Sequence, residues 1–342
     1  GSWTIVGVPK GVDYSQVGQT MNNCGGKLTP NGTIFSAEEF YTDNNLELFS
    51  VFKDTSDFNG KPFKENFGWI VEVDPELKRA TKKLTGFGRY SHEDAVCTPN
   101  GKSVYITNDE SPAVLFKFEA DVPFNYEKGN LYAYSESKKW IGLPNDYESL
   151  LNIRQIAISK GATLFTRHEW LTLIHDKLYI TETGIDTGSY AAAISLGGVL
   201  PSYYKQDAFV NDPYGRVLVL DLATDELSVE IEGGEYGDIM FSNPDCITSY
   251  SYNGEDYLMI NEDINGVSHG RSEQSFSLND VFRYNLELKT LEQVLRSPNG
   301  SETTGGVFDA FGNYFLNIQH PNGMNKAPFN RSTLIVIKGL IK

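Results

Sequence analysis

Positive charge is scarce in this chain. Its 342 residues include 29 Lys and Arg against 45 Asp and Glu, which gives a formal net charge of −16. Proteins that bind nucleic acid need clustered basic side chains to contact the phosphate backbone, so the composition argues against nucleic acid as a partner. The acidic excess either keeps the protein soluble or neutralises bound cations, and composition leaves both interpretations open.

Cysteine and long apolar runs are also scarce. The three cysteines, Cys24, Cys97 and Cys246, form an odd set without the paired spacing of a zinc site. Neither a disulfide framework nor structural zinc is therefore indicated. No apolar run approaches the length that crosses a bilayer, and we expect no membrane contact.

Aromatic residues and glycine, in contrast, are abundant. The chain has 19 Tyr, 20 Phe and 32 Gly, a mixture typical of many short strands joined by tight turns. A chain of 342 residues can bury a large core without help from disulfides. Because no low-complexity segment or linker marks a boundary, we predict one all-β domain over residues 1–342.

One pattern recurs five times along the chain. Each copy has an acidic or thiol residue before a predicted β-hairpin and a polar or acidic residue at its end. The copies are Cys24 to Glu39, Glu93 to Asp109, Glu169 to Glu182, Asp245 to Asp263, and Glu302 to His320. Because the strands of a hairpin run in opposite directions, the first residue of one and the last of the other lie at the same end.

A second set of apolar or alternating segments follows the hairpins. These segments are Gly68 to Asp74, Val114 to Glu119 with Leu131 to Tyr134, Gly215 to Asp221 with Glu226 to Ile231, Val281 to Tyr284 with Leu291 to Leu295, and Thr333 to Lys338. Each repeat thus predicts four strands, as in the blade of a β-propeller. We predict five to six blades with loop insertions, and a metal site at one mouth of the central channel.

Three segments outside this pattern have assignments of their own. Tyr147 to Leu164 is a candidate sixth blade, and Trp3 to Val8 is a candidate strand that closes the ring with the C-terminal blade. Gly188 to Asn211 is either an insertion over the channel mouth or a surface loop. The same two interpretations apply to Ile264 to Asn279, which holds His269 and Arg271.

The carboxylates of the repeats would gather at the channel mouth. Two carboxylates about 5 Å apart repel by roughly 3 kcal/mol at an effective dielectric of about 20, so the arrangement calls for cations. Oxygen ligands select hard ions such as calcium, and a thiolate favours a transition metal. The alternative is that these groups cap strand ends in solvent. The candidate ligands are Cys24, Glu38, Glu39, Glu93, Glu169, Glu262, Asp263 and Glu302.

Cations and imidazoles flank two of these carboxylates. Arg167 and His168 precede Glu169, and Arg89 and His92 precede Glu93. A guanidinium fork beside metal ligands suits an anionic substrate, because it can hold two oxygens of a phosphate or carboxylate. The alternative is a salt bridge that orients the glutamate.

A further candidate is His320. It ends a predicted strand that faces the channel, and we interpret it as either a substrate-binding or a hydrogen-bonded structural residue.

Several motifs together resemble the PhoX-type alkaline phosphatases, in the family's order and over nearly the whole chain. The motifs are Asn23-Cys24-Gly-Gly, Thr29-Pro30-Asn-Gly-Thr33, Ser36-Ala-Glu38-Glu39, Phe67-Gly-Trp69, Glu72-Val-Asp-Pro75, Gly88-Arg-Tyr-Ser-His92-Glu93, Arg167-His-Glu169-Trp170, Asn243-Pro-Asp245, Glu302-Thr-Thr-Gly305 and Asn317-Ile-Gln-His-Pro321.

The resemblance implies a secreted or periplasmic β-propeller that hydrolyses small-molecule phosphomonoesters with a cluster of Fe(III) and Ca²⁺ (calcium). Carried over residue by residue, it makes Cys24, Glu93 and Glu169 iron ligands, with Glu93, Glu169 and Arg167 catalytic. As calcium ligands it implies Glu302 together with Glu38 or Glu39, and either Glu262 or Asp263, with Asp280 as a further candidate. It also implies that Arg167 contacts the phosphate.

Two other functions share this predicted architecture. One is a calcium propeller that hydrolyses lactones without iron, and the other is a binding module whose mouth takes a protein or glycan. We also expect the protein to be a monomer.

Overall fold

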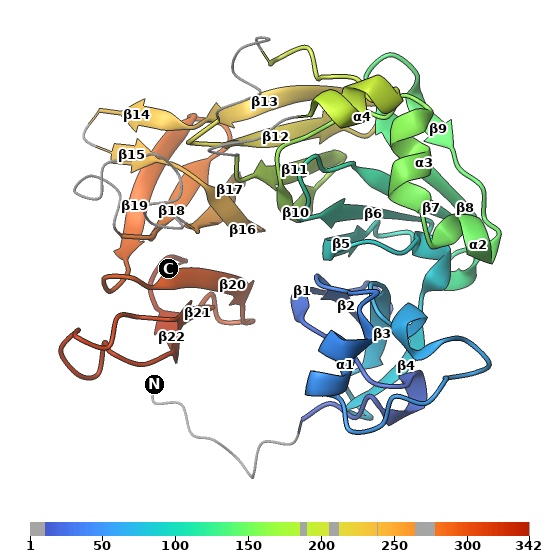
Figure 1. Ribbon diagram of the computed structural model, residues 1–342. Helices are drawn as coiled ribbons and strands as arrows, with labels where there is room; N and C mark the ends of the chain where they lie inside the picture. Colours follow the sequence, from blue (N-terminus) through green and yellow to red (C-terminus); the bar gives the residue numbers. More distant parts are fainter. Residues whose placement is uncertain (1–10, 185–189, 205–211, 238, 264–277, 342) are drawn as a thin grey trace.

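Five small antiparallel sheets form a ring in the computed structural model, which describes residues 11–184, 190–204, 212–237, 239–263 and 278–341 (Figure 1). Each sheet is a blade whose strands follow one another in sequence order, and the first strand of each blade lies nearest the ring axis. First strands of consecutive blades contact one another, from β1 through β5, β10 and β16 to β20. The predicted all-β propeller is confirmed, with five blades.

The blades differ in their number of strands. Blade 1 comprises β1 (Asn23–Leu28), β2 (Ile34–Glu38), β3 (Ile70–Asp74) and β4 (Arg79–Lys83). Blade 2 comprises β5 (His92–Cys97), β6 (Ser103–Asn108), β7 (Phe116–Val122), β8 (Asn125–Ser135) and β9 (Lys139–Gly142). Blade 3 comprises β10 (His168–Ile174), β11 (Lys177–Glu182), β12 (Arg216–Asp221) and β13 (Glu226–Glu232). Blade 4 comprises β16 (Pro244–Tyr252), β17 (Glu255–Glu262), β18 (Asp280–Asn285) and β19 (Thr290–Arg296); blade 5 comprises β20 (Glu302–Phe308), β21 (Tyr314–Gln319) and β22 (Thr333–Ile337); a separate hairpin pairs β14 (Gly234–Tyr236) with β15 (Ile239–Phe241).

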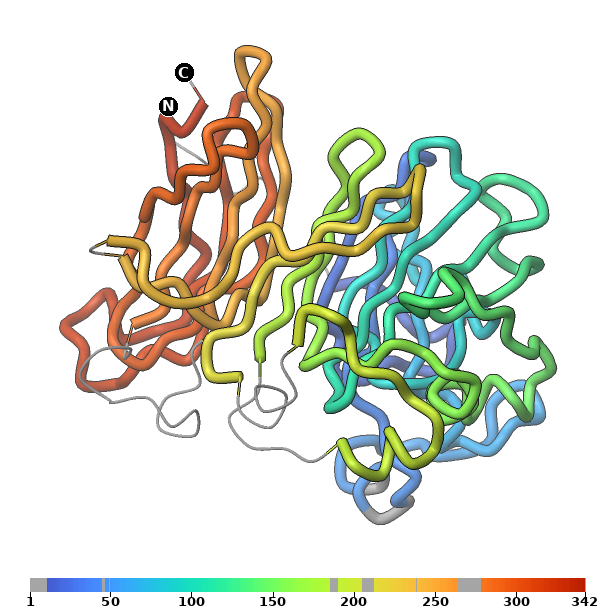
Figure 2. Tube along the Cα trace, turned by 90° about the horizontal axis from the view of Figure 1, so that it is seen from above, coloured from blue at the N-terminus to red at the C-terminus, as the bar shows by residue number. Residues whose placement is uncertain are grey.

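Local sequence explains the first hairpins of blades 1 and 2. Both turns read Thr-Pro-Asn-Gly, at residues 29–32 and 98–101. Gly32 and Gly101 have φ angles of 90° and 69°, a left-handed conformation that glycine adopts without steric cost. Figure 2 shows such hairpin turns at one end of the ring, and helices α1 (Asn45–Val51) and α4 (Ala191–Leu196) at the other.

The hydrophobic core lies between adjacent blades. Phe35 of blade 1 packs edge-on against Tyr126 of blade 2, with ring centroids 5.2 Å apart. Further buried clusters join blades 2 and 3 around Leu171, blades 3 and 4 around Ile247, and blades 4 and 5 around Tyr314. Because each cluster draws on two blades, burial of these side chains stabilises the ring that positions the channel.

The region proposed as a sixth blade is helical instead. Residues 147–164 contain α2 (Tyr147–Leu150) and α3 (Ile153–Ser159), and Asp146 caps α2 by accepting a hydrogen bond from the Ser149 backbone N–H. Leu150, Ile153 and Ala157 are buried against the core of blades 1 and 2. Their spacing of three and four residues is the helical period, which explains why strand alternation is weak there.

Other predicted segments fall partly or wholly outside the described residues. Trp3 to Val8 lies outside them, as do residues 264–277 with His269 and Arg271. Of the predicted insertion at 188–211, residues 190–204 are described and pack on blade 3, where the Tyr203 hydroxyl donates to Glu182. The remaining short helices are η1 (Ser15–Val17), η2 (Phe63–Asn66) and η3 (Thr85–Phe87), and none of the described helices could span a bilayer.

Candidate active site and metal centre

A β-bulge near the start of the first strand shapes the site in blades 1 to 4. In blade 1, Asn23 pairs with Glu38 and Gly26 with Ser36, so Cys24 and Gly25 face only one residue of β2. The first bulge residue in the four blades is Cys24, Glu93, Glu169 and Asp245, in that order. A bulge re-aims the side chain that it carries. The same local irregularity thus directs one thiol and three carboxylates to the same end of the ring.

Three groups of potential metal ligands result from this convergence. Within each group, one ligand atom from every residue lies within 4.8 Å of the others. The groups are Cys24 with Glu39 and Glu93; Glu93 with Glu169 and Asp245; and Asp245 with Asp263 and Glu302. Because Glu93 and Asp245 each belong to two groups, the three form one continuous cluster. A carboxylate that belongs to two groups could contribute to binding a metal ion in either of them.

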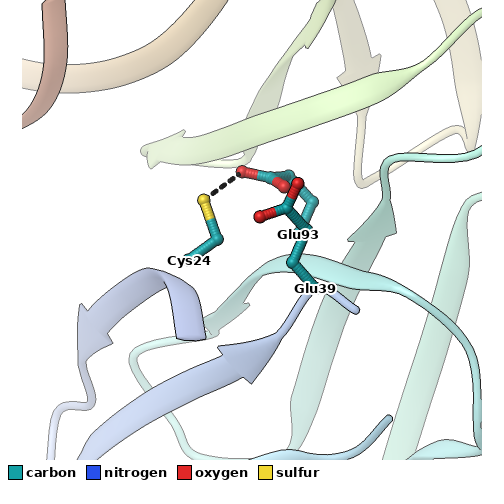
Figure 3. Close-up of side chains that lie close together, drawn as sticks. All are labelled: Cys24, Glu39 and Glu93. Atoms are coloured by element: carbon teal, nitrogen blue, oxygen red, sulfur yellow. Dashed lines mark hydrogen bonds between the residues drawn. The ribbon is translucent and has the colours of Figure 1, made fainter. Parts of the chain in front are cut away.

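Figure 3 shows the group that contains the thiol. Cys24 comes from β1, Glu39 directly follows β2, and Glu93 comes from β5. The Cys24 Sγ donates a hydrogen bond to Glu93 Oε1 at 3.0 Å. Burial and the charge of Glu93 raise the pKa of the thiol, so without a cation it stays protonated.

Blade 5 contributes its carboxylate in a different way. Its bulge lies at Gly305 and Gly306, two residues that offer no ligand. Glu302 precedes this bulge and joins Asp245 and Asp263 from blade 4. Burial and the charge of Asp263 raise the pKa of Glu302 to about 7.

Electrostatics shows that this cluster is unfavourable without cations. Burial raises the pKa values of Glu93, Glu169 and Asp245 well above their ordinary range, and neighbouring carboxylates raise them further. Glu169 Oε1 lies 2.9 Å from the Arg167 Nη2, yet makes no hydrogen bond to any described residue. Buried carboxylates with unused oxygens fit metal binding, because a cation offsets both their desolvation and their mutual repulsion.

Arg167 is fixed beside this cluster by Asp109. Its Nε donates to Asp109 Oδ1 at 2.7 Å and its Nη2 to Oδ2 at 3.1 Å, a bidentate pair. Although burial acts against the charged form, Glu169 and Asp109 raise the pKa of Arg167, so the guanidinium remains charged. Arg89, in contrast, donates to the backbone oxygens of Phe67 and Lys64, so it serves blade 1 packing.

The structure does not bring Glu38 and Glu262 into these groups. Each ends the second strand of its blade and accepts backbone N–H groups: Glu38 from Trp69 at 3.0 Å, and Glu262 from Ser242 at 2.7 Å and Asp280 at 3.0 Å. Glu38 also pairs with Lys83 at 2.8 Å. The residues that follow them, Glu39 and Asp263, belong to the ligand groups.

Two further candidates also lie apart from the described ligand groups. Asp280 forms hydrogen bonds with Arg296 and Gln293. His320 is exposed, has a φ angle of 54°, and donates its backbone N–H to Ser332 Oγ at 3.3 Å. Its role in substrate binding stays a prediction.

Sequence reasoning left two residues out of the candidate ligands and catalytic residues. Asp245 begins the fourth hairpin, in the same place as Glu93 and Glu169, and this shared place in the repeat was the signal that could have identified it. Asp109 follows the second hairpin as Glu39 follows the first. Its pairing with Arg167 joins blades 2 and 3, so only the assembled ring shows it.

Comparisons with known proteins agree with this geometry. A family profile described as alkaline phosphatase PhoX matches residues 2–322. The chain belongs to the PhoX alkaline phosphatase family. It is accordingly a metal-dependent hydrolase of phosphoric monoesters. No curated protein gave a significant match to the chain.

One solved structure shows the same fold, and two others are weaker matches. Pseudomonas fluorescens PhoX in complex with vanadate, a transition state analogue, is 21% identical with a TM-score of 0.69, and the match covers 93% of this chain and 69% of that one. An endo-arabinase from Bacteroides thetaiotaomicron is 8% identical with a TM-score of 0.42, and the match covers 97% and 99% of the two chains. The periplasmic gluconolactonase of Pseudomonas aeruginosa is 10% identical with a TM-score of 0.41, covering 92% and 73%.

Proposed function

We propose that this PhoX-family phosphatase uses Fe(III) and Ca²⁺ (calcium), bound by the three joined ligand groups, to hydrolyse small phosphate monoesters. The observation that supports this most directly is that Glu93 and Asp245 are each shared by two groups. The proposed ligands are Cys24, Glu39, Glu93, Glu169, Asp245, Asp263 and Glu302. Glu38 and Glu262 are omitted because backbone amides already occupy their carboxylates.

The donor atoms of the groups favour different ions. The group of Cys24, Glu39 and Glu93 contains the only sulfur, and a thiolate with carboxylates suits a transition metal such as iron. The group of Asp245, Asp263 and Glu302 offers oxygen alone, which calcium prefers. A mixed iron and calcium centre follows from this division.

Arg167 is the proposed phosphate-binding residue. Asp109 fixes the plane of its guanidinium, so little conformational freedom is lost when the remaining donors meet a phosphate oxygen. When bound, the metal ions supply positive charge that polarises the phosphoryl group and stabilises negative charge in the transition state. Glu93 and Glu169, as metal ligands, would hold the positively charged ions next to Arg167.

Location and assembly are further parts of the proposal. Carboxylate calcium sites in extracellular modules work at calcium concentrations of about 10⁻⁴ to 10⁻³ M, so the oxygen-only group suits a secreted or periplasmic enzyme. We also propose that the enzyme is a monomer.

The test is release of phosphate from p-nitrophenyl phosphate by the wild-type protein and by Glu93→Ala and Glu169→Ala. Each substitution removes a ligand next to Arg167, so we expect kcat/KM to fall about a hundredfold or more, because metal charge stabilisation is worth several kcal/mol. EDTA should abolish the wild-type activity.

The matched control is Glu72→Ala. Glu72 is also a buried glutamate, but it lies within β3 and accepts a hydrogen bond from Thr33, away from the ligand groups. Full activity in folded Glu93→Ala and Glu169→Ala would refute the site. Elemental analysis separates the alternatives. A lactone-hydrolysing propeller would contain calcium without iron, and a binding module would contain structural metals or none.

A further inference from the structure

A lysine and an aspartate meet next to the ligand cluster, near the axis of the ring. Lys27 of β1 places its Nζ 3.4 Å from Asp94 Oδ2 of β5. The Asp94 side chain is fully buried and that of Lys27 is 16% exposed. Neither residue belongs to a metal-ligand group, and the proposed chemistry uses neither of them.

This pair contacts blades 1 to 4. Lys27 Nζ donates to the backbone oxygen of Ile247 in β16 at 3.2 Å and lies 4.2 Å from the ring centroid of Trp170 in β10. Asp94 Oδ2 also accepts the backbone N–H of Leu171 in β10 at 3.3 Å. A single ion pair therefore links the first strands of four blades.

Each of these contacts lies close in sequence to a proposed metal ligand. Asp94 and Trp170 are the second residues of the bulges that begin with Glu93 and Glu169. Ile247 directly follows the bulge that begins with Asp245, and Lys27 follows Cys24 by three residues. The pair thus contacts the first strands of blades 1 to 4 at or just after their bulges.

We propose that Lys27 and Asp94 are positioning residues that hold the four bulges at the spacing required for metal binding. The proposal rests on the proposed function, because the ligands that it orients are those assigned there. Four strands can move less relative to one another when one buried ion pair contacts all of them. Directed polar contacts also fix the distances between strands more narrowly than apolar contacts do.

The experiment measures how fast bound metal is lost to excess EDTA in Lys27→Met, Asp94→Asn and the double variant, together with apparent melting temperatures of the metal-free proteins. Changes to residues that orient metal ligands cost about ten- to a hundredfold in metal affinity. We expect each variant to release metal at least about tenfold faster than the wild type.

The double variant separates positioning from stability. Removing both charges leaves no unpaired buried ion, so its metal-free melting temperature should return towards that of the wild type. Its metal release should stay fast, because the contacts to the four blades are still lost. If the double variant recovered both the melting temperature and the slow metal release of the wild type, the proposal would be overturned.

The matched control is Lys117→Met. Lys117 is 12% exposed, pairs with Glu119 at 3.0 Å and lies 4.5 Å from the Trp140 ring centroid, but all of these partners belong to blade 2. Lys117→Met should retain metal like the wild type. Metal loss as fast as in the Lys27 and Asp94 variants would instead show a general effect of destabilisation and contradict the proposal. A wild-type protein that binds no metal would instead refute the proposed function.

Discussion

Cys24 is the only one of the three cysteines in a metal-ligand group among the described residues. Cys97 is buried against the Tyr126 hydroxyl, 2.9 Å away, and Cys246 accepts the Gly305 backbone N–H at 3.2 Å. Cys97 thus packs against neutral groups, whereas Cys246 also contacts the neighbouring Asp245 carboxylate at 3.6 Å. Cys24 Sγ donates to Glu93 and Cys246 Sγ to Asp245, but only the Cys24 thiol shares a ligand group with its partner among the described residues.

At the residue scale, Cys24→Ser should weaken iron retention. The change replaces a soft thiolate by a hydroxyl that is not ionised, so we expect at least the roughly tenfold loss of affinity that changes around a metal site cause. Iron content and the visible absorption spectrum measure this. Cys97→Ser is the matched control and should keep both, and unchanged iron in Cys24→Ser would remove the residue from the ligand set.

Adjacent acidic residues also differ in their contacts. Glu38 and Glu39 are neighbours, but the first pairs with Lys83 inside blade 1 and the second belongs to a ligand group. Glu262 and Asp263 repeat this division in blade 4. Successive side chains at a strand end point in different directions, so one member of each pair stabilises its blade and the other enters the mouth.

At the element scale, the close approach of β1 to β5 depends on Gly25, the second bulge residue of blade 1. A Cβ at this position would lie 2.3 Å from the Glu93 backbone oxygen and 2.9 Å from the Asp94 Cβ. Real side chains do not approach so closely, so β1 and β5 could not keep their spacing. Cys24 and Glu93 meet only because this residue has no side chain.

We therefore expect Gly25→Ala to lower the free energy of unfolding by about 1–3 kcal/mol and to reduce metal content, because overpacking forces the two strands apart. Urea unfolding and elemental analysis measure the two effects. Gly26→Ala is the matched control, since a Cβ there would lie 3.6 Å from the nearest atom, an ordinary contact. Equal behaviour of the two variants would contradict the argument.

On the scale of the whole molecule, the metal ions connect the blades. The ligand groups draw on all five blades, with Glu93 joining the first two groups and Asp245 the last two. Without cations these buried carboxylates repel one another, so metal binding and closure of the ring stabilise each other.

Removal of metal should therefore lower the melting temperature of the whole propeller. A ligand present at about 100 times its Kd stabilises a protein by roughly 2.7 kcal/mol, so we expect a shift of several degrees in calorimetry after EDTA treatment. Asp245→Asn should show much less of this shift, because it weakens two groups at once. Glu72→Ala should keep the full shift, and a wild-type protein that melts at the same temperature with and without metal would refute the coupling.

The amino-acid sequence by itself determined the repeats, and with them much of the fold and site. Alternation along the strands and the Thr-Pro-Asn-Gly turns depend on neighbouring residues, so the propeller and the carboxylates at hairpin ends were predictable. Tertiary structure alone decided which side chains meet. The strand end of β2 selects Glu39 over Glu38, and the ring brings Asp109 to Arg167 and Lys27 to Asp94. These contacts depend on the approach of separate blades, and no local pattern encodes that distance.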